Sequence, residues 1–237
     1  MNDTTIALVT GANKGIGFTV ARELAERGWT ILIGSRDPAR GAAAVAELSE
    51  LDVRGVKVDV TSQPSVDAAA KIIDAQYGRL DVLINNAGVI GSRVPALEVG
   101  ADDMLAAYDT NVFGAVRMMR AFVPLLRHSA RPRVVMVSSG MGSITITSDP
   151  ERLESQLIGL PYPSSKTALN MITSQYAKAL PEFRINAADP GYTATDLNGH
   201  RGVQTVEEGS EAILALASVE ADGPTGGFFD RHGRVPW

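Results

Sequence analysis

The sequence predicts a doubly wound α/β protein, with a seven-stranded, mainly parallel sheet covered by helices on both faces. Short apolar runs rich in β-branched residues alternate with longer amphipathic segments along the chain. Most of these runs are apolar throughout, which is typical of parallel strands that are buried on both faces. The first run also ends in a glycine-rich turn that leads directly into a helical pattern.

Each short apolar run is an expected strand. The strands are Ile6 to Thr10, Thr30 to Gly34, Val56 to Asp59, Val82 to Asn85, Val134 to Ser138, Ile185 to Asp189 and Gly227 to Asp230. The amphipathic segments predict helices over residues 16–26, 39–51, 63–77, 102–127, 163–179 and 205–218. No Pro/Gly/Ser-rich linker, repeat or low-complexity block interrupts this pattern, so we expect residues 1–237 to form a single domain.

Composition excludes several classes of function. The net charge of -5, without a dense Lys/Arg run, argues against a nucleic-acid partner. The absence of cysteine removes disulfides, thiolate metal sites and cysteine nucleophiles. His128, His200 and His232 are scattered, so we expect no metal site. No apolar stretch reaches membrane-spanning length and no signal peptide is recognisable, which predicts a cytoplasmic protein without a membrane partner.

The first expected strand ends in a turn with the glycine spacing G-x-x-x-G-x-G, formed by Gly11, Gly15 and Gly17. Glycines at such a turn let the backbone bend sharply and approach a pyrophosphate, whose charge meets the amides and positive dipole end of the following helix. The spacing differs from the commoner fingerprint G-x-G-x-x-G. Its place after the first strand of a doubly wound sheet favours dinucleotide binding over a purely structural joint.

The end of the second expected strand bears on the choice between NAD and NADP. In this fold an acidic side chain there binds the ribose 2′-hydroxyl, whereas a basic one accommodates a 2′-phosphate. Ser35 stands where an NAD enzyme would carry its carboxylate, and Arg36 follows it. Arg36 suits a fork-like grip on phosphate, and Lys14 adds a second positive charge. We therefore predict NADPH/NADP+ as the cofactor. The alternative is that both are solvated surface cations, with Asp37 partly neutralising Arg36.

Tyr162 and Lys166 are four residues apart, which places both side chains on one face of a helix. A phenol has a reference pKa of about 10 and transfers protons poorly at neutral pH, but a neighbouring cation stabilises the phenolate and lowers that pKa. The pair therefore predicts a tyrosine acid assisted by an ammonium group. The same spacing is common on ordinary surface helices, so its meaning depends on the other motifs.

Together these motifs resemble the short-chain dehydrogenase/reductase family nearly end to end. The matching marks are Thr10 to Gly17, Asp59-Val60, Asn85-Asn86-Ala87-Gly88, Asn111, Ser138-Ser139, Tyr162-x-x-x-Lys166 and Pro190-Gly191. Within the family the chain most resembles the carbonyl-reductase-like NADPH enzymes. This likeness rests on Ser35-Arg36, the long stretch before Tyr162 and the ending Gly226 to Asp230. The resemblance implies a Rossmann-type fold and the reduction of small or medium carbonyl compounds.

The resemblance also implies how residues are arranged around the cofactor. Asp59 and Val60 would flank the adenine, Asn85 to Gly88 would support the sheet beside the cofactor, and Thr195 would contact the nicotinamide carboxamide. The expected cofactor-binding residues are Gly11, Asn13, Lys14, Gly15, Ile16, Gly17, Ser35, Arg36, Asp59, Val60, Asn86, Ala87, Gly88, Tyr162, Lys166, Pro190, Gly191, Thr193 and Thr195.

The expected catalytic residues are Asn111, Ser139, Tyr162 and Lys166. A carbonyl that accepts hydride develops negative charge on its oxygen, so the site needs hydrogen-bond donors and a proton there. Tyr162 would give the proton, and Ser139, the second serine of its pair, would donate a hydrogen bond to the substrate oxygen. By resemblance, Lys166 also binds the nicotinamide ribose, and Asn111 supports a water that links Lys166 to solvent.

Two segments are expected to shape the substrate pocket. The stretch between Ser139 and Tyr162 is several residues longer than in most of the family, and the extra residues form an insertion at about 147–158. We hypothesise that this insertion forms part of the pocket wall and obstructs the helix surface on which many relatives dimerise, which leaves monomer and homodimer both open. Residues 191–204, including Tyr192 and Leu197, would form a substrate lid.

Other functions are weighed against a reductase. A non-catalytic NADP(H)-binding redox sensor has no need of the four catalytic residues, whereas an NAD(P)-dependent alcohol dehydrogenase would use them in the oxidative direction. Chain length and glycine spacing disfavour a sugar-nucleotide epimerase, and Ser139 lacks the G-x-S-x-G elbow of a hydrolase. We therefore predict an NADPH-dependent reductase of a small-molecule carbonyl substrate.

Overall fold

One continuous sheet forms the centre of the computed structural model, which describes residues 4–237. Its strand order is β3-β2-β1-β4-β5-β6-β7-β8; β1 to β7 run parallel, and β8 pairs antiparallel with β7. The strands are β1 Ile6–Thr10, β2 Thr30–Ser35, β3 Val53–Lys57, β4 Val82–Asn85, β5 Arg133–Val137, β6 Arg184–Ala188, β7 Phe228–Asp230 and β8 Gly233–Arg234. The predicted doubly wound fold is confirmed, with the two-residue β8 added to the seven expected strands.

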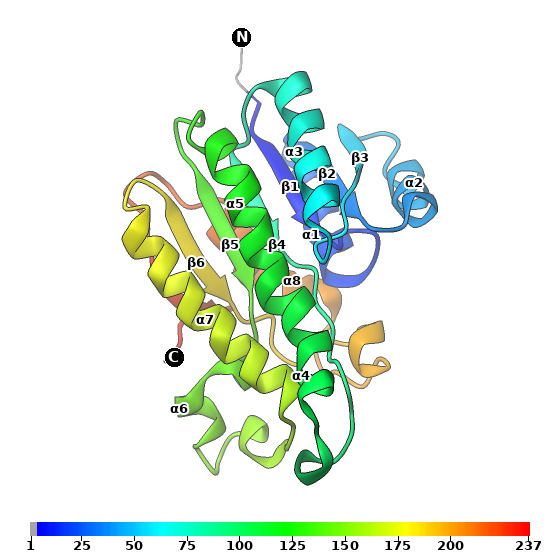
Figure 1. The fold of residues 1–237 in the computed structure, drawn as a ribbon. Coiled ribbons are helices and arrows are strands. Elements are labelled where there is room, and N and C mark those ends of the chain that lie inside the picture. Colours follow the sequence, from blue (N-terminus) through cyan, green and yellow to red (C-terminus); the bar gives the residue numbers. More distant parts are fainter. Residues whose placement is uncertain (1–3) are drawn as a thin grey trace.

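Helices cover both faces of the sheet (Figure 1). They are α1 Gly15–Glu26, α2 Pro38–Glu47, α3 Gln63–Tyr77, α4 Ala101–Tyr108, α5 Gly114–Leu126, α6 Ile144–Thr147, α7 Pro161–Ala179 and α8 Val206–Ala217. Residues of α3, α5 and α7 pack on one face, where Phe122 and Phe183 are fully buried. Residues of α1, α2 and α8 pack on the other face. The central strands are therefore apolar on both sides, as their sequences predict.

The predicted helix over 102–127 is divided in the structure. A π-helical turn at Asp109–Phe113 separates α4 from α5. At this turn the side chain of Asn111 accepts a hydrogen bond from the Val89 amide and donates to the Val89 carbonyl, each at 2.9 Å. These two bonds tie the widened turn to the loop after β4, which periodicity along the helix could not reveal.

The third strand was predicted at the wrong place. It covers Val53–Lys57 rather than Val56 to Asp59, with Val53 opposite Ile31 and Lys57 opposite Ser35. As an edge strand, β3 pairs only with β2, so backbone pairing rather than apolar side chains sets its limits. In addition, α7 begins at Pro161 rather than at residue 163, because proline is readily accommodated in the first helical turn.

The loops that follow β1, β4, β5 and β6 all lie at the carboxyl end of the sheet. Figure 1 shows α6 and the yellow-green segment before α7 at this end, together with the orange segment after β6. Ligands of doubly wound proteins bind at this end of the sheet. Across residues 4–237, no helix combines the length and the apolar character needed to cross a membrane.

Candidate active site

The glycine-rich turn after β1 has the backbone geometry that its sequence predicts. Gly11 and Gly15 have φ angles of 65° and 57°, a region that other residues adopt only at a cost. A Cβ atom on Gly17 would lie 2.4 Å from the Asn86 side-chain amide, which itself donates to the Thr10 carbonyl at 2.8 Å. Asn86 thus supports the turn from the loop after β4, the role expected of its motif.

A cleft of about 760 Å³ begins at this turn and extends across the carboxyl ends of the strands. It is lined by most of the expected cofactor residues: Gly11, Asn13, Lys14, Gly15, Ile16, Gly17, Ser35, Arg36, Asp59, Val60, Asn86, Ala87, Gly88, Tyr162, Lys166, Pro190 and Thr195. The glycine turn at the amino end of α1 leaves room for a pyrophosphate, so these residues fit a dinucleotide. Gly191 and Thr193, which were also expected, do not line the cleft.

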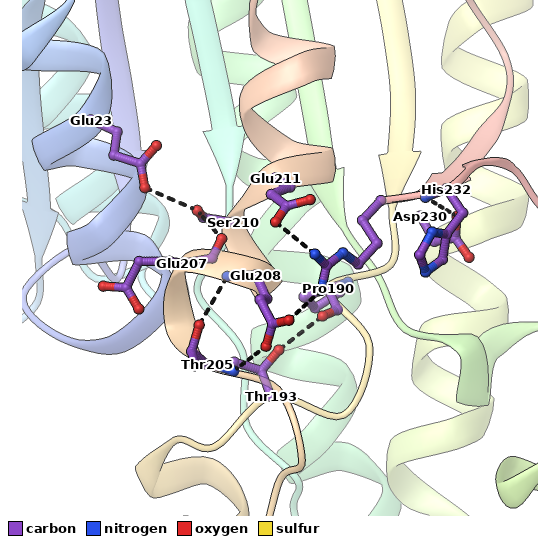
Figure 2. A network of polar contacts seen from close by, with 11 residues as sticks. Glu23, Pro190, Thr193, Thr205, Glu207, Glu208, Ser210, Glu211, Asp230 and His232 are labelled. Atoms are coloured by element: carbon purple, nitrogen blue, oxygen red, sulfur yellow. Dashed lines mark hydrogen bonds and ion pairs between the residues drawn. The ribbon is translucent and has the colours of Figure 1, made fainter.

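Thr193 lies instead at the base of residues 191–204, the segment that was expected to form a lid. It is 4% exposed, and its hydroxyl donates to the Pro190 carbonyl at 2.8 Å. Figure 2 shows this contact beside Thr205, which accepts from Glu208 at the start of α8. Because Thr193 pairs with Gln204 in an isolated bridge, the two arms of the lid are joined where they leave the sheet. Thr195 lies beyond the bridge and reaches the cleft.

The outer end of the cleft is rich in positive charge. Arg36 and Lys14 line it as predicted, and so does Arg40, which the sequence analysis missed. A signal for Arg40 was present, because it follows Arg36 by four residues at the start of a helix. Asp37 caps α2 by accepting from two backbone amides, and its carboxylate pairs with Arg40 at 3.4 Å.

Lys14 also makes a link across the cleft. Its ammonium lies 2.6 Å from the Asp196 carboxylate in the lid, and Asp196 accepts from His200 at 2.8 Å. The hydrogen bonds from Lys14 and His200 hold the pKa of Asp196 below its usual value. All three residues are exposed, so this link ties the lid to the glycine turn only weakly.

Asp59, which the family resemblance places beside the adenine, lines the cleft close to Arg36. Its carboxylate accepts from the Thr61 amide at 3.0 Å and from the Thr61 hydroxyl at 2.7 Å. Burial raises the Asp59 pKa, but the Thr61 hydrogen bonds and the charges of Arg36 and Arg117 outweigh it, so the pKa lies below its usual value. The hydrogen bonds from Thr61 to the Asp59 carboxylate thus fix the conformation of the loop after β3.

Tyr162 lines the inner end of the cleft together with Ser138, whereas Ser139 contacts Tyr162 without lining the cleft itself. Ser139 follows β5 and forms a side-chain hydrogen bond with the Tyr162 hydroxyl. The preceding Ser138 is 1% exposed, and its hydroxyl donates to Asn170 at 2.5 Å. The Ser138 hydroxyl is therefore held by a residue of α7. This supports Ser139, the second serine of the pair, as the residue that acts with Tyr162.

Lys166 is 4% exposed, and its ammonium donates to the Val137 carbonyl at 2.7 Å. The ammonium lies 5.6 Å from the centroid of the Tyr162 ring, so the two side chains share one side of α7 as their spacing predicts. Burial lowers the pKa of Lys166 to about 8, against an opposing effect of the negative charge of Asp189.

The predicted lowering of the Tyr162 pKa is wrong for this arrangement. Burial raises the pKa of Tyr162 to about 12, and the charge of Asp189 adds to this, while the Ser139 hydrogen bond opposes it. Lys166 does not reverse the shift because its own proton leaves at a lower pH than that of the phenol. Tyr162 therefore carries its proton throughout the neutral range.

Asn111 is 2% exposed and does not line the cleft. Besides its bonds to Val89, its amide donates to the Ser165 hydroxyl at 2.9 Å. A Cβ on Gly88 would lie 3.4 Å from the Asn111 oxygen and 3.6 Å from the Lys166 ammonium. The structure thus brings Asn111 close to Lys166, with Gly88 next to both side chains.

The 147–158 insertion lies against the loop that carries Ser139. A Cβ on Gly140 would lie 2.9 Å from a carboxylate oxygen of Glu154, which pairs with Arg152 at 3.5 Å. Before this insertion in the sequence, the Thr145 hydroxyl donates to the Trp237 carbonyl at the carboxyl end of the chain. The insertion therefore borders the catalytic loop, while Leu157 and Ile158 remain 47% and 89% exposed.

The class of protein follows from this geometry: a glycine turn, a long cleft at the carboxyl ends of parallel strands and a tyrosine–lysine pair at its inner end are typical of a dinucleotide-dependent α/β protein. Comparison with known proteins is more specific. The family model described as short chain dehydrogenase matches residues 5–205, and the chain belongs to this family of oxidoreductases.

Relatives and solved structures agree with this assignment. The chain is 35% identical to a (+)-neomenthol dehydrogenase of Arabidopsis thaliana, with 95% of each chain covered. It is 35% identical to a (-)-isopiperitenone reductase of Mentha piperita, with 95% of this chain and 96% of that protein covered. An NADPH-bound carbonyl reductase from chicken fatty liver is 27% identical, with a TM-score of 0.87 and 99% of each chain covered.

Proposed function

We propose that this protein is an NADPH-dependent reductase that converts a small or medium ketone or aldehyde to an alcohol, with Tyr162 as the proton donor. The observation that carries the proposal is that Tyr162 and Lys166 line one end of a cleft, with Ser139 bonded to Tyr162, while Arg36, Arg40 and Lys14 line the other end. Family membership and the reductases among the relatives support it.

The basic end of the cleft supports NADPH over NADH. Arg36, Arg40 and Lys14 would hold the 2′-phosphate, since guanidinium and ammonium groups recognise phosphate by charge-assisted hydrogen bonds. Ser35 cannot replace the carboxylate of an NAD enzyme, and its hydroxyl is already bonded to the Asp37 carbonyl at 2.8 Å. The NADPH-bound carbonyl reductase among the solved structures has the same fold. When bound, NADPH supplies the hydride.

The protein's own residues would donate the proton and stabilise the negative charge that develops on the carbonyl oxygen. Tyr162 remains protonated at neutral pH because its pKa is about 12, so its hydroxyl can donate to a carbonyl oxygen. Ser139 orients that hydroxyl and can itself donate to the same oxygen. The Lys166 ammonium, held by Val137, adds positive charge beside the phenol and opposes the build-up of negative charge. Asn111 fixes the loop behind Lys166.

The proposal is tested by measuring NADPH oxidation with a panel of aldehydes, α-diketones, quinones, keto esters and hydroxysteroid-type ketones. Tyr162→Phe should reduce turnover of an accepted substrate by roughly 10²- to 10⁴-fold, the usual contribution of general acid catalysis. NADPH affinity, measured by fluorescence titration, should change little, because the lost hydroxyl acts on the carbonyl.

Tyr176→Phe is the matched control, since Tyr176 lies on the same helix, is half-buried and packs against the core. It should leave turnover close to the wild-type value. Full turnover by Tyr162→Phe would refute Tyr162 as the acid. NADPH binding without oxidation of any carbonyl in the panel would instead favour a redox sensor.

A further inference from the structure

Asp189 is a buried carboxyl group that the mechanism above does not use. It directly follows β6 and is 6% exposed. Strand β5 pairs with β6 so that Val137 lies opposite Ala188, and the Ser138 amide donates to the Ala188 carbonyl at 2.7 Å. This register places Asp189 next to the start of the Ser139 loop. Burying a carboxyl group is costly unless it is hydrogen-bonded, so its partners are informative.

The Asp189 carboxylate joins two segments of the active site. One oxygen accepts from the Gly191 amide at 2.9 Å, and the carboxylate also accepts from the Gly140 amide. A Cβ on Gly140 would lie 2.9 Å from the second oxygen, so Asp189 is in close contact with this loop. Gly140 follows Ser139, and Gly191 follows Pro190, which lines the cofactor cleft.

Charged groups face Asp189 from each element packed around it. Glu154 of the insertion and Asp230 at the end of β7 are negative, and both raise the pKa of Asp189, as burial does more strongly. From α7, the charge of Asp189 acts on Lys166, where it favours the ammonium, and on Tyr162, where it disfavours the phenolate. Asp189 is the carboxylate that affects both members of the Tyr162 and Lys166 pair.

We propose that Asp189 is a positioning residue for the reduction: its carboxylate holds the Ser139 loop against the Pro190-Gly191 segment and so fixes Ser139 beside Tyr162. This inference rests on the proposed function. A negative charge on Asp189 at this place also favours the Lys166 ammonium and disfavours the Tyr162 phenolate, in addition to the effects of burial.

Two variants separate the charge from the contacts. Asp189→Asn keeps an oxygen that can accept from Gly191 but loses the negative charge and one acceptor. Asp189→Ala loses the charge and both acceptors. Glu154→Gln is the control, because it removes a neighbouring negative charge that acts on Asp189 but not on Lys166 or Tyr162.

The first measurement is the pH dependence of kcat/KM for an accepted carbonyl at saturating NADPH. In Asp189→Asn the alkaline limb should move to lower pH by roughly one unit, since removing a nearby negative charge makes both Lys166 and Tyr162 lose their protons more easily. Glu154→Gln should keep the wild-type limb. Asp189→Ala should show the same shift and also a raised KM for NADPH. An unshifted limb in Asp189→Asn would overturn the proposal.

The second measurement does not depend on turnover. The folded protein, labelled with ¹³C at the ε-carbon of lysine, is titrated by NMR, and the Lys166 signal is assigned by its absence in Lys166→Met. Lys166 should titrate near pH 8 in the wild type, as its pKa of about 8 requires, and at lower pH in Asp189→Asn. An identical titration in both would refute the role of the charge. A wild-type protein that reduces no carbonyl would defeat only the proposed function, since the titration would still report on Asp189.

Discussion

At the scale of single residues, side chains that are close together in the site differ sharply in their hydrogen-bond partners and in the direction of their pKa shifts. Ser138 and Ser139 are neighbours, yet one hydroxyl is held by Asn170 inside the protein and the other bonds to Tyr162. Lys166 and Tyr162 are one turn apart, yet burial moves the pKa of one down and that of the other up. The same desolvation acts on both, because burial disfavours the charged form of each group.

Arg36 is the residue on which cofactor choice should depend. Arg36→Asp should weaken NADPH binding by roughly 10- to 100-fold, the equivalent of about 1.5–3 kcal/mol for a hydrogen bond to a charged group. NADH binding should change far less, because NADH has no 2′-phosphate and a carboxylate at this strand end can bind the ribose hydroxyls. Fluorescence titration with both cofactors measures the difference.

Lys71→Asp provides the control for a change of two charge units, since Lys71 is exposed on α3 and does not line the cleft. It should leave both affinities within a few fold of wild type at physiological salt, where distant surface charges are screened. Equal weakening of NADPH and NADH by Arg36→Asp would remove the phosphate-binding role.

At the scale of elements, the loops at the carboxyl end of the sheet determine the shape of the site. The 191–204 segment, the expected lid, is closed at its base by the bridge between Thr193 and Gln204, and Asp196 within it pairs with Lys14 of the glycine turn. The first half of α8 is fixed by Arg231, which pairs with Glu208 and Glu211 at 2.7 and 2.9 Å. Opening of the lid would therefore centre on residues between the bridge and the tip.

The 147–158 insertion should contribute to substrate selection. The paired substitution Leu157→Ser and Ile158→Ser removes two exposed apolar side chains from it. We expect KM for apolar ketones to rise several-fold, because each lost apolar contact with the substrate weakens binding by roughly 1–3 kcal/mol at most. The kcat value should change little, since neither residue belongs to the catalytic set. Steady-state kinetics across the carbonyl panel checks this.

Ile72→Ser is the matched control, since Ile72 is also an exposed apolar residue but lies on α3. A second variant, with residues 149–158 replaced by a short Gly-Ser linker, tests the effect on assembly by light scattering. Unchanged substrate preference in the paired substitution would exclude the insertion from the pocket wall. Unchanged mass in the shortened variant would exclude it as a block to dimerisation.

At the scale of the whole molecule, burial within the fold sets the pH range of the activity. The Lys166 side chain extends from α7 to the Val137 carbonyl of β5 and is buried there. This burial lowers the pKa of Lys166 to about 8. A group with a lowered pKa keeps its charge below that value and loses it above. Reduction should therefore be fastest below about pH 8, and kcat/KM at saturating NADPH should fall towards tenfold per pH unit above it.

The measurement is a pH–rate profile between pH 6 and 10, with circular dichroism at each pH to show that the fold is intact. The proton of Tyr162 does not limit this range, because its pKa is about 12. A profile that stays flat to pH 10 would show that the ammonium of Lys166 is dispensable for the reduction.

Much of the fold and most of the site could be predicted from the sequence. Gly11, Gly15 and Gly17 predicted the phosphate turn, and the spacing of Tyr162 and Lys166 predicted their common side of α7. These features are local: they depend on backbone freedom at a few positions and on the periodicity of a helix. Alternation of apolar strands and amphipathic helices likewise predicted the order of elements.

Only the tertiary structure decided the remaining features. The sequence could not place β3 correctly, because an edge strand is limited by its pairing with β2. It could not show that Thr193 belongs to the base of the lid, or that Asp189 contacts Gly140 across two strand ends. The direction of the Tyr162 pKa also depended on packing, because desolvation depends on segments that are distant in the chain. The sequence by itself determined the order of strands and helices and indicated the residues that we propose for the chemistry. The packing of those segments decided which groups meet, and which of them carry charge.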